Sequence, residues 1–285
     1  MPVLFKTFES SYPIARLTSI QSTGLAPLYV ECPTAEALIQ ARHTYPKHYL
    51  IGGGSNTILD PDNPTPIVRF TDATINQIHH NRVYITAGTP IAKALRQCSD
   101  WGLSGLELAA GVPAYIGGMI AMNFGCWGQT VAQWIHRVHY IDANNQLAWR
   151  SVDACEFGYR SSWFKENQMP IVGAEFDLTP TDTSRIRTAI ADAIARRQTA
   201  QPLRDKTYGS MFLNPPDASA AQLIDDSQLK GYQIGGAKVS CKHANFMVNI
   251  GHASFHDIQS LLHVIQDRVY TRTQITLNPE VCQAL

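Results

Sequence analysis

The apolar and polar positions in the first 72 residues predict strands separated by a helix. Short apolar runs at Leu28–Cys32 and Tyr49–Ile51 predict two strands. Between them, Thr34 precedes the helix-favouring segment Ala35–Arg42 and is placed to cap it. A proline-rich loop at residues 61–66 follows. The pattern therefore indicates a small βαβ-like unit.

The next stretch, residues 73–200, alternates strand and helix patterns on a larger scale. Apolar stripes at helical spacing predict helices over residues 91–101 and 183–198. Strands are predicted at residues 82–86, 138–141, 147–149 and 171–178.

The remaining residues form a third region after the break at Ala200–Leu203. Ser254 is a candidate N-cap for a helix whose apolar face includes Phe255 and Val269. Strands are predicted at Met211–Leu213, Phe246–Asn249 and Gln274–Leu277. Strands with separate helices indicate an α+β chain, with domains at residues 1–72, 73–200 and 201–285.

Charge and composition limit the classes of ligand that the protein is expected to bind. The 285 residues are 45% apolar, and 23 basic side chains balance 23 acidic ones. A neutral chain lacks the general attraction for nucleic acid, so an anionic ligand must be held locally. Six scattered cysteines without a CxxC pair favour reduced thiols and no metal site.

Targeting signals do not change this picture. No secretory signal is apparent at the N-terminus, which predicts a cytoplasmic protein. The uncharged run Leu108–Phe124 covers roughly 17 residues, short of the ~20 needed to span a bilayer. No membrane insertion and no obligate protein partner are expected.

Two glycine-rich passages carry the first candidate chemistry. In Gly52-Gly53-Gly54-Ser55-Asn56, exposed backbone N–H groups and short polar side chains can cradle a diphosphate. The turn lacks the lysine of a Walker loop and the helix that follows a Rossmann fingerprint. A tight hairpin with left-handed glycines explains the turn equally well.

The second passage runs from Gly105 to Gly125. Its Gly117-Gly118 pair lets another backbone or a flat ligand approach closely. Packing alone explains either passage singly. Two such passages in one chain favour a dinucleotide-like cofactor.

These motifs resemble those of the UDP-N-acetylenolpyruvoylglucosamine reductase family, whose fold is shared with vanillyl-alcohol oxidase and p-cresol methylhydroxylase. The resemblance implies a two-part FAD-binding module followed by a C-terminal α+β substrate-binding domain. It implies FAD held non-covalently, because no histidine lies in the glycine turn. The implied cofactor contacts are Gly52, Gly53, Gly54, Ser55, Asn56, Gly111, Pro113, Gly117, Gly118, Asn123 and Gly125.

The resemblance continues in three later motifs, which imply the catalytic residues Arg160, Ser210 and Glu280. Arg160 lies in a Tyr-Arg motif, and a guanidinium can hold a carboxylate through two hydrogen bonds. Ser210 lies in Gly-Ser-x-Phe-x-Asn-Pro, and Glu280 follows Pro279. Taken singly, the three also fit a surface arginine, a strand-edge serine and a solvated carboxylate.

The implied substrate contacts are Tyr159, Asn214, Lys242 and His243. The short spacing between Arg160 and Ser210 is similar to that of the shorter subclass of the family. Tyr115 and Trp127 depart from the family pattern beside the cofactor, and Cys241 departs beside Lys242.

The activity implied by the resemblance is peptidoglycan precursor synthesis. NADPH would reduce FAD, and N5 of the flavin would pass the hydride to the enolpyruvyl group of UDP-N-acetylglucosamine enolpyruvate. Ser210 would supply the proton that completes UDP-N-acetylmuramate, and Arg160 and Glu280 would stabilise the enolate.

The motifs also leave two other functions open. A flavin oxidase of the same fold explains Gly52–Asn56 but not the combination of Ser210, Asn214 and Glu280. A UDP-sugar binder without turnover would have no need of Arg160, Ser210 and Glu280.

Overall fold

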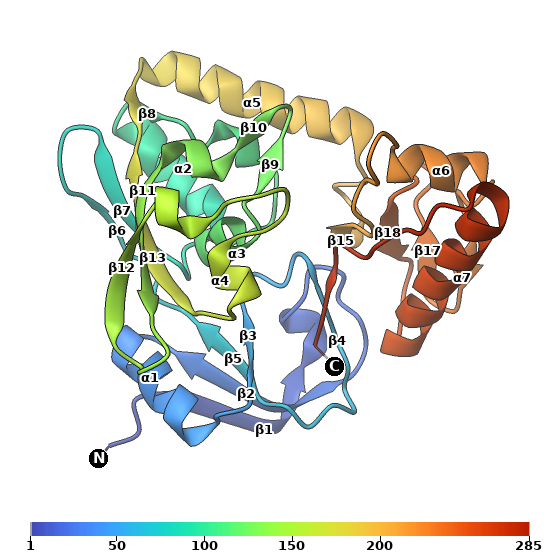
Figure 1. Cartoon of the computed structure of the whole chain (residues 1–285), viewed down its shortest axis with the longest axis horizontal. Coiled ribbons are helices and arrows are strands. Elements are labelled where there is room, and N and C mark those ends of the chain that lie inside the picture. Colours follow the sequence, from blue (N-terminus) through green and yellow to red (C-terminus); the bar gives the residue numbers. More distant parts are fainter. Residues whose placement is uncertain (1, 285) are drawn as a thin grey trace. The chain divides into compact units, whose positions relative to one another are not determined.

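The computed structural model describes residues 2–284 and shows an α+β chain (Figure 1). Contacts divide the chain into two compact units. Unit 1 comprises Met1–Thr7, Tyr29–Gly53 and Pro66–Arg196, and unit 2 comprises Phe8–Leu28, Gly54–Thr65 and Arg197–Leu285. Met1 and Leu285, at the ends of the outer predicted domains, lie outside the described residues. The three predicted domains, with boundaries after residues 72 and 200, stay a prediction.

A four-stranded sheet has the order β1-β2-β5-β3. Strands β2 and β3 both run parallel to β5, and a parallel arrangement requires a crossover between successive strands. Helix α1 provides it, starting at Thr34, whose side chain accepts a hydrogen bond from the Ala37 N–H at 3.1 Å. The predicted βαβ unit is therefore confirmed. The elements are β1 (Lys6–Pro13), β2 (Leu25–Cys32), α1 (Ala35–Thr44), β3 (Tyr49–Ile51) and β5 (Ile67–Phe70).

Unit 1 also contains a five-stranded antiparallel sheet with the order β12-β11-β13-β7-β6. One face is apolar and buried, with Val83, Ile85, Val138 and Phe176, and α3 contacts β13 and β7. The elements are β6 (Ile75–Gln77), β7 (Arg82–Thr86), α2 (Ile91–Asp100), α3 (Ile116–Ala121), β11 (Ile135–Ile141), β12 (Leu147–Ser151), α4 (Trp163–Glu166), β13 (Ile171–Asp177) and α5 (Thr183–Ala200), whose last turn, from Arg197, belongs to unit 2.

Unit 2 is built on a four-stranded sheet with the order β15-β18-β17-β16. Helix α7 packs on β16 and β17 and contacts α6 (Figure 1). Ser254 starts α7 with a reciprocal capping box to Asp257, so the predicted N-cap is confirmed. The elements are β15 (Lys206–Ser210), α6 (Ala220–Asp226), β16 (Gln233–Ile234), β17 (Ala237–Val239), β18 (Phe246–Asn249) and α7 (Phe255–Thr273).

A two-stranded parallel sheet in unit 2 joins distant parts of the sequence. Strand β4 (Thr57–Leu59) pairs with β19 (Cys282–Ala284). The remaining short elements are η1 (Ile14–Arg16), β8 (Leu103–Ser104), η2 (Glu107–Ala109), β9 (Gly125–Cys126), β10 (Gln129–Thr130), η3 (Val131–Trp134), η4 (Asp153–Cys155) and β14 (Thr179–Pro180).

Two predicted strands of unit 2 are wrong. Residues 211–213 follow β15 and contribute only an isolated bridge between Phe212 and Pro279. Residues 274–277 form no strand, because α7 ends at Gln274 in the left-handed conformation and the chain turns. Apolar side chains in both segments are buried by packing rather than by strand pairing.

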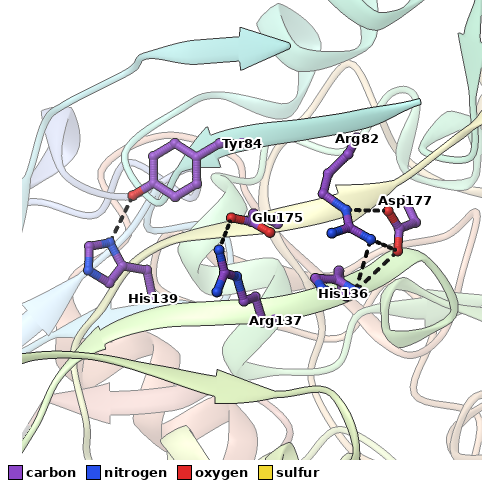
Figure 2. Close-up of polar contacts among 7 residues, drawn as sticks. All are labelled: Arg82, Tyr84, His136, Arg137, His139, Glu175 and Asp177. Carbon is purple, nitrogen blue, oxygen red and sulfur yellow. Dashed lines mark hydrogen bonds and ion pairs between the residues drawn. The ribbon is translucent and has the colours of Figure 1, made fainter. Parts of the chain in front are cut away.

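The other face of the five-stranded sheet is polar (Figure 2). Arg82 donates two hydrogen bonds to Asp177, at 2.6 and 3.0 Å, and His136 lies 3.2 Å from the same carboxylate. Nearby, Arg137 forms an ion pair with the buried Glu175 at 2.6 Å. The hydrogen bond from Arg82 holds the pKa of Asp177 below its usual value.

The Asp177 contacts predict a pH-dependent contribution to stability. Because folding lowers the pKa of Asp177, its contribution is present above the unfolded pKa and is lost as the pH falls through the folded pKa. The carboxylate is 39% exposed, so Asp177→Asn should cost only about 0.2–1 kcal/mol at neutral pH. Urea unfolding at several pH values should show a shallower acid dependence in this variant. Asp192→Asn, in an exposed position of α5, controls for the loss of one charge, and an equal change in both variants would contradict the prediction.

Candidate functional site

The glycine-rich turn is not a hairpin. Strand β3, before it, pairs with β5, whereas β4, after it, pairs with β19. A side chain at Gly54 would collide with the carbonyl oxygen of Leu17, and its φ of +65° also favours glycine. The turn therefore needs glycine to pass close to other backbone, and the hairpin alternative is excluded.

The two glycine-rich passages meet in unit 1. A Cβ on Gly52 would lie 3.7 Å from the backbone nitrogen of Gly118. A Cβ on Gly117 would lie 2.9 Å from the Cβ of Ala87. A Cβ on Gly118 would have no described atom within 4 Å apart from its chain neighbours and the backbone of its own helix. Gly118 therefore borders open space beside the turn, which fits a ligand that lies against bare backbone. This observation supports the fit of FAD to these residues.

Arg160 is held close to the end of the second passage. Its Nη1 donates to the carbonyl oxygen of Gly125 at 3.0 Å, and its backbone has a left-handed φ of 54°. Asn123 donates to the carbonyl oxygen of Gly158 at 2.9 Å. The hydroxyl of the buried Ser162 donates to the carbonyl oxygen of Ala121 at 2.7 Å. These bonds keep an unusual backbone conformation in place, as is common at functional sites.

Ser210 and Glu280 come together within unit 2. The backbone N–H of Glu280 donates to the carbonyl oxygen of Met211, the residue after Ser210, at 2.9 Å. Ser210 itself ends β15 at an irregularity in the pairing with β18, where Gly209 has a φ of +89°. Such a bulge redirects the side chains next to it.

The glycine-rich turn reaches the same place through its last residues. The side chain of Asn56 donates to the carbonyl oxygen of Glu280 at 3.0 Å, and the Asn56 carbonyl accepts from the Cys282 N–H at 2.9 Å. Ser19 connects the turn to β15, because its N–H donates to Gly54 at 3.0 Å and its hydroxyl donates to Thr207 at 2.6 Å. Sequence reasoning missed Ser19, which carries no motif that distinguishes it from other polar residues.

The predicted substrate residues have varied surroundings. Tyr159 is exposed, and the Asn214 side chain accepts a hydrogen bond from the Ala220 N–H at the start of α6. Lys242 donates to the carbonyl oxygen of Gln198 and lines a cavity of about 440 Å³ in unit 2. Burial lowers the pKa of His243, and the charge of Lys230 lowers it further. His243 is therefore held in its neutral form at neutral pH.

Among residues 2–284, no group of three or more histidine, cysteine or acidic side chains is placed to hold a metal ion. No helix in that range is long and apolar enough to cross a bilayer.

Comparison with known proteins gives the class first. A model of the FAD binding domain matches residues 28–149, which include both β3 and the second glycine-rich passage up to Gly125. The α+β fold and the meeting glycine passages thus belong to an FAD-binding oxidoreductase. A model of the C-terminal domain of UDP-N-acetylenolpyruvoylglucosamine reductase matches residues 201–283.

Whole-chain relatives identify the family. UDP-N-acetylenolpyruvoylglucosamine reductase of Staphylococcus carnosus is 34% identical, over 94% of this chain and 89% of the relative. The enzyme of that name from Methylococcus capsulatus is 35% identical, over 96% of this chain and 92% of the relative. The crystal structure of the Thermus caldophilus reductase superposes with a TM-score of 0.83 at 27% identity, covering 98% of both chains. The chain belongs to the UDP-N-acetylenolpyruvoylglucosamine reductase family.

Membership confirms the family, the α+β fold class, FAD as the cofactor and the expected FAD-dependent reductase of peptidoglycan precursor synthesis. The individual site residues and the shorter subclass stay predictions. Tyr115, a departure from the family pattern, has a clear position, because its ring would lie 2.8 Å from a Cβ on Gly53.

Gly118→Ala tests whether the open space beside the second passage holds FAD. The added methyl group meets no described atom apart from its chain neighbours and the backbone of its own helix, and alanine is favoured over glycine in a helix by up to ~1 kcal/mol, so the fold should persist. We expect an unchanged or higher melting temperature of the FAD-free protein and roughly tenfold weaker FAD binding, measured by flavin fluorescence. Gly54→Ala should instead impair folding itself. Unaltered FAD affinity in a folded Gly118→Ala protein would remove Gly118 from the cofactor contacts.

Proposed function

We propose that this protein reduces the enolpyruvyl group of UDP-N-acetylglucosamine enolpyruvate to give UDP-N-acetylmuramate, with NADPH as the reductant. Family membership supports the reaction. The observation that carries the residue assignment is the hydrogen bond from Glu280 to Met211, which joins the Pro-Glu motif to the Ser210 motif beside Asn56. We also propose that the protein acts in the cytoplasm, as the sequence predicts.

The cofactor and its contacts come first in the proposed mechanism. FAD, when bound, supplies hydride transfer between the reductant and the enolpyruvyl double bond. In unit 1, the backbones of Gly52 and Gly118 would hold part of the FAD. Ser55 and Asn56 are assigned to it by the sequence motif, as short polar side chains suited to a diphosphate. Gly53 lies close to Tyr115 and Pro113, and Gly54 lies close to Leu17. These two glycines are therefore assigned to the conformation of the turn.

Arg160 is assigned to the substrate carboxylate. Addition of hydride to the β-carbon moves negative charge onto that carboxylate as an enolate, and a guanidinium can stabilise it through two hydrogen bonds. The bond from Arg160 to Gly125 uses Nη1 and restrains the side chain before the substrate arrives. A restrained donor loses less freedom on binding than a mobile one.

Ser210 is assigned as the proton donor to the α-carbon, and Glu280 as the group that stabilises or orients the donor. A serine hydroxyl is a weak acid, so it can act only on a strong base such as the enolate and only when held close. The bulge at Gly209 and the bond between Met211 and Glu280 support such a fixed position.

The nucleotide part of the substrate is assigned to Tyr159, Asn214, Lys242 and His243. Lys242, Arg204 and Asp205 line the cavity of unit 2, and their charges leave it net positive, which suits a diphosphate. His243, neutral because burial lowers its pKa, can contribute hydrogen bonds without a competing charge.

Visible spectroscopy of the FAD-loaded protein tests the reaction. NADPH should bleach the flavin absorbance under anaerobic conditions, and the enolpyruvyl nucleotide should restore it. Recolouring by that nucleotide and not by UDP-N-acetylglucosamine separates the proposed activity from that of another flavin oxidase. A protein that binds the UDP-sugar but takes up no FAD would support the non-catalytic alternative.

Ser210→Ala tests the proton donor. Flavin reduction by NADPH should keep its rate, whereas reoxidation by the enolpyruvyl nucleotide should slow by at least about 100-fold, because only the second half-reaction needs the proton. Stopped-flow absorbance measures both. Ser227→Ala, which removes a hydroxyl bonded to Leu223 in the same unit, should change neither rate. Fast reoxidation in Ser210→Ala would show that another group delivers the proton.

A further inference from the structure

One cavity of unit 1 lies apart from the residues assigned to catalysis. It has a volume of about 640 Å³ and is bordered by α2, residues 110–113 and α5. Ile91, Leu95, Val112, Ile190 and Ile194 give it an apolar wall. We call it the α2–α5 groove. Its volume is typical of sites for small organic molecules.

A buried hydroxyl marks one end of this groove. Ser99 lines it and is only 3% exposed, and its Oγ has no hydrogen-bond partner among residues 2–284. Buried hydroxyl groups normally have a partner, because an unpaired one loses its bonds to water without replacement. A ligand with an acceptor at this end would satisfy Ser99.

Charged side chains surround the same end. Arg187 of α5 lies 3.3 Å from the Asp100 carboxylate, next to Ser99 at the end of α2. Arg96 lies one helical turn before Ser99 and also lines the groove. Two arginines and one aspartate leave one net positive charge in a chain whose formal net charge is zero. The ligand that complements this charge is a monoanion.

Helix dipoles do not reverse this preference. The C-terminal end of α2 is unfavourable for an anion, but the groove near Arg187 also lies within two turns of the first residue of α5, Thr183. The opposite ends of two helices therefore offset one another. The arginine side chains therefore determine that the groove favours a negatively charged ligand.

We propose that the α2–α5 groove binds a small amphipathic carboxylate. Its hydrocarbon part packs against Ile91, Leu95, Ile190 and Ile194, and its carboxylate accepts a hydrogen bond from Ser99 beside Arg96 and Arg187. This site is additional to the proposed reaction, in which neither α2 nor α5 has a role.

The groove shares a wall with the predicted cofactor residues. Gly111 and Pro113 line it, and the Pro113 carbonyl oxygen would lie 3.1 Å from a Cβ on Gly53. Residues 110–113 thus separate the groove from the glycine-rich turn. The ligand is therefore expected to bind the FAD-loaded protein without displacing FAD.

Calorimetric titration of the FAD-loaded protein with decanoate tests the proposal. We expect one saturable site with a dissociation constant of roughly 0.1–1 mM, as for a ligand of this size. Nonyltrimethylammonium, which has the same nonyl chain and the opposite charge, should bind at least about tenfold more weakly. Equal binding of both would contradict the assigned charge, and release of FAD by decanoate would show that the groove is part of the cofactor site.

Matched variants locate the bound carboxylate. Ser99→Ala and Arg96→Gln should each weaken decanoate binding by about 5- to 10-fold, the usual effect of losing one hydrogen bond or charge partner. Ile190→Trp should abolish binding by filling the groove. Arg185→Gln, at an exposed position of α5 outside the groove, should leave it unchanged. Absence of saturable binding to the folded wild type, or undiminished binding to Ile190→Trp, would overturn the proposal.

Discussion

The attachment of Asn56 to the chain around Glu280 is the constraint on which the arrangement of unit 2 depends. The Asn56 side chain bonds to Glu280 and its backbone bonds to Cys282, and the parallel pair β4 and β19 starts directly after these contacts. Because Glu280 also bonds to Met211, the same attachment sets the position of the segment that carries Ser210. Three motifs that are far apart in sequence therefore share one hydrogen-bonded frame.

Glycine has two separate physical roles in the two glycine-rich passages. At Gly54, another backbone approaches so closely that a side chain cannot fit. At Gly118, the space is open and available to a ligand. A sequence motif treats these positions alike, whereas the structure separates a requirement of folding from a candidate contact of the cofactor.

Local patterns were enough to predict most helices and the βαβ unit. Thr34 and Ser254 are caps whose side chains act within a few residues, so their role is visible in the sequence. The failed strands at 211–213 and 274–277 are apolar segments whose burial depends on partners more than 60 residues away in one case and on the turn after α7 in the other. Period alone does not distinguish such segments from strands.

In the candidate site too, some residues could be predicted from the sequence and others are visible only in the structure. Arg160, Ser210 and Glu280 were identified through motif resemblance, since each residue taken singly fits an ordinary surface role. The structure adds two residues that no motif contains. Ser19 bonds to β15 from beside the glycine-rich turn, and Ser162, two residues after Arg160, bonds to the backbone of Ala121. Their bonds reach backbone atoms, which any sequence supplies, so their partners leave no signature in the sequence.

Each of the two units consists of separate segments of the chain, and this affects when each unit can fold during translation. The last segment of unit 1 ends at Arg196, whereas unit 2 combines Phe8–Leu28 and Gly54–Thr65 with the segment that begins at Arg197. On a ribosome, unit 1 can complete its contacts while the rest of the chain is still being made. The early segments of unit 2 must wait for β19, whose pairing partner β4 is made more than 200 residues earlier. The unit that carries Ser210 and Glu280 therefore closes only after β19 has been made.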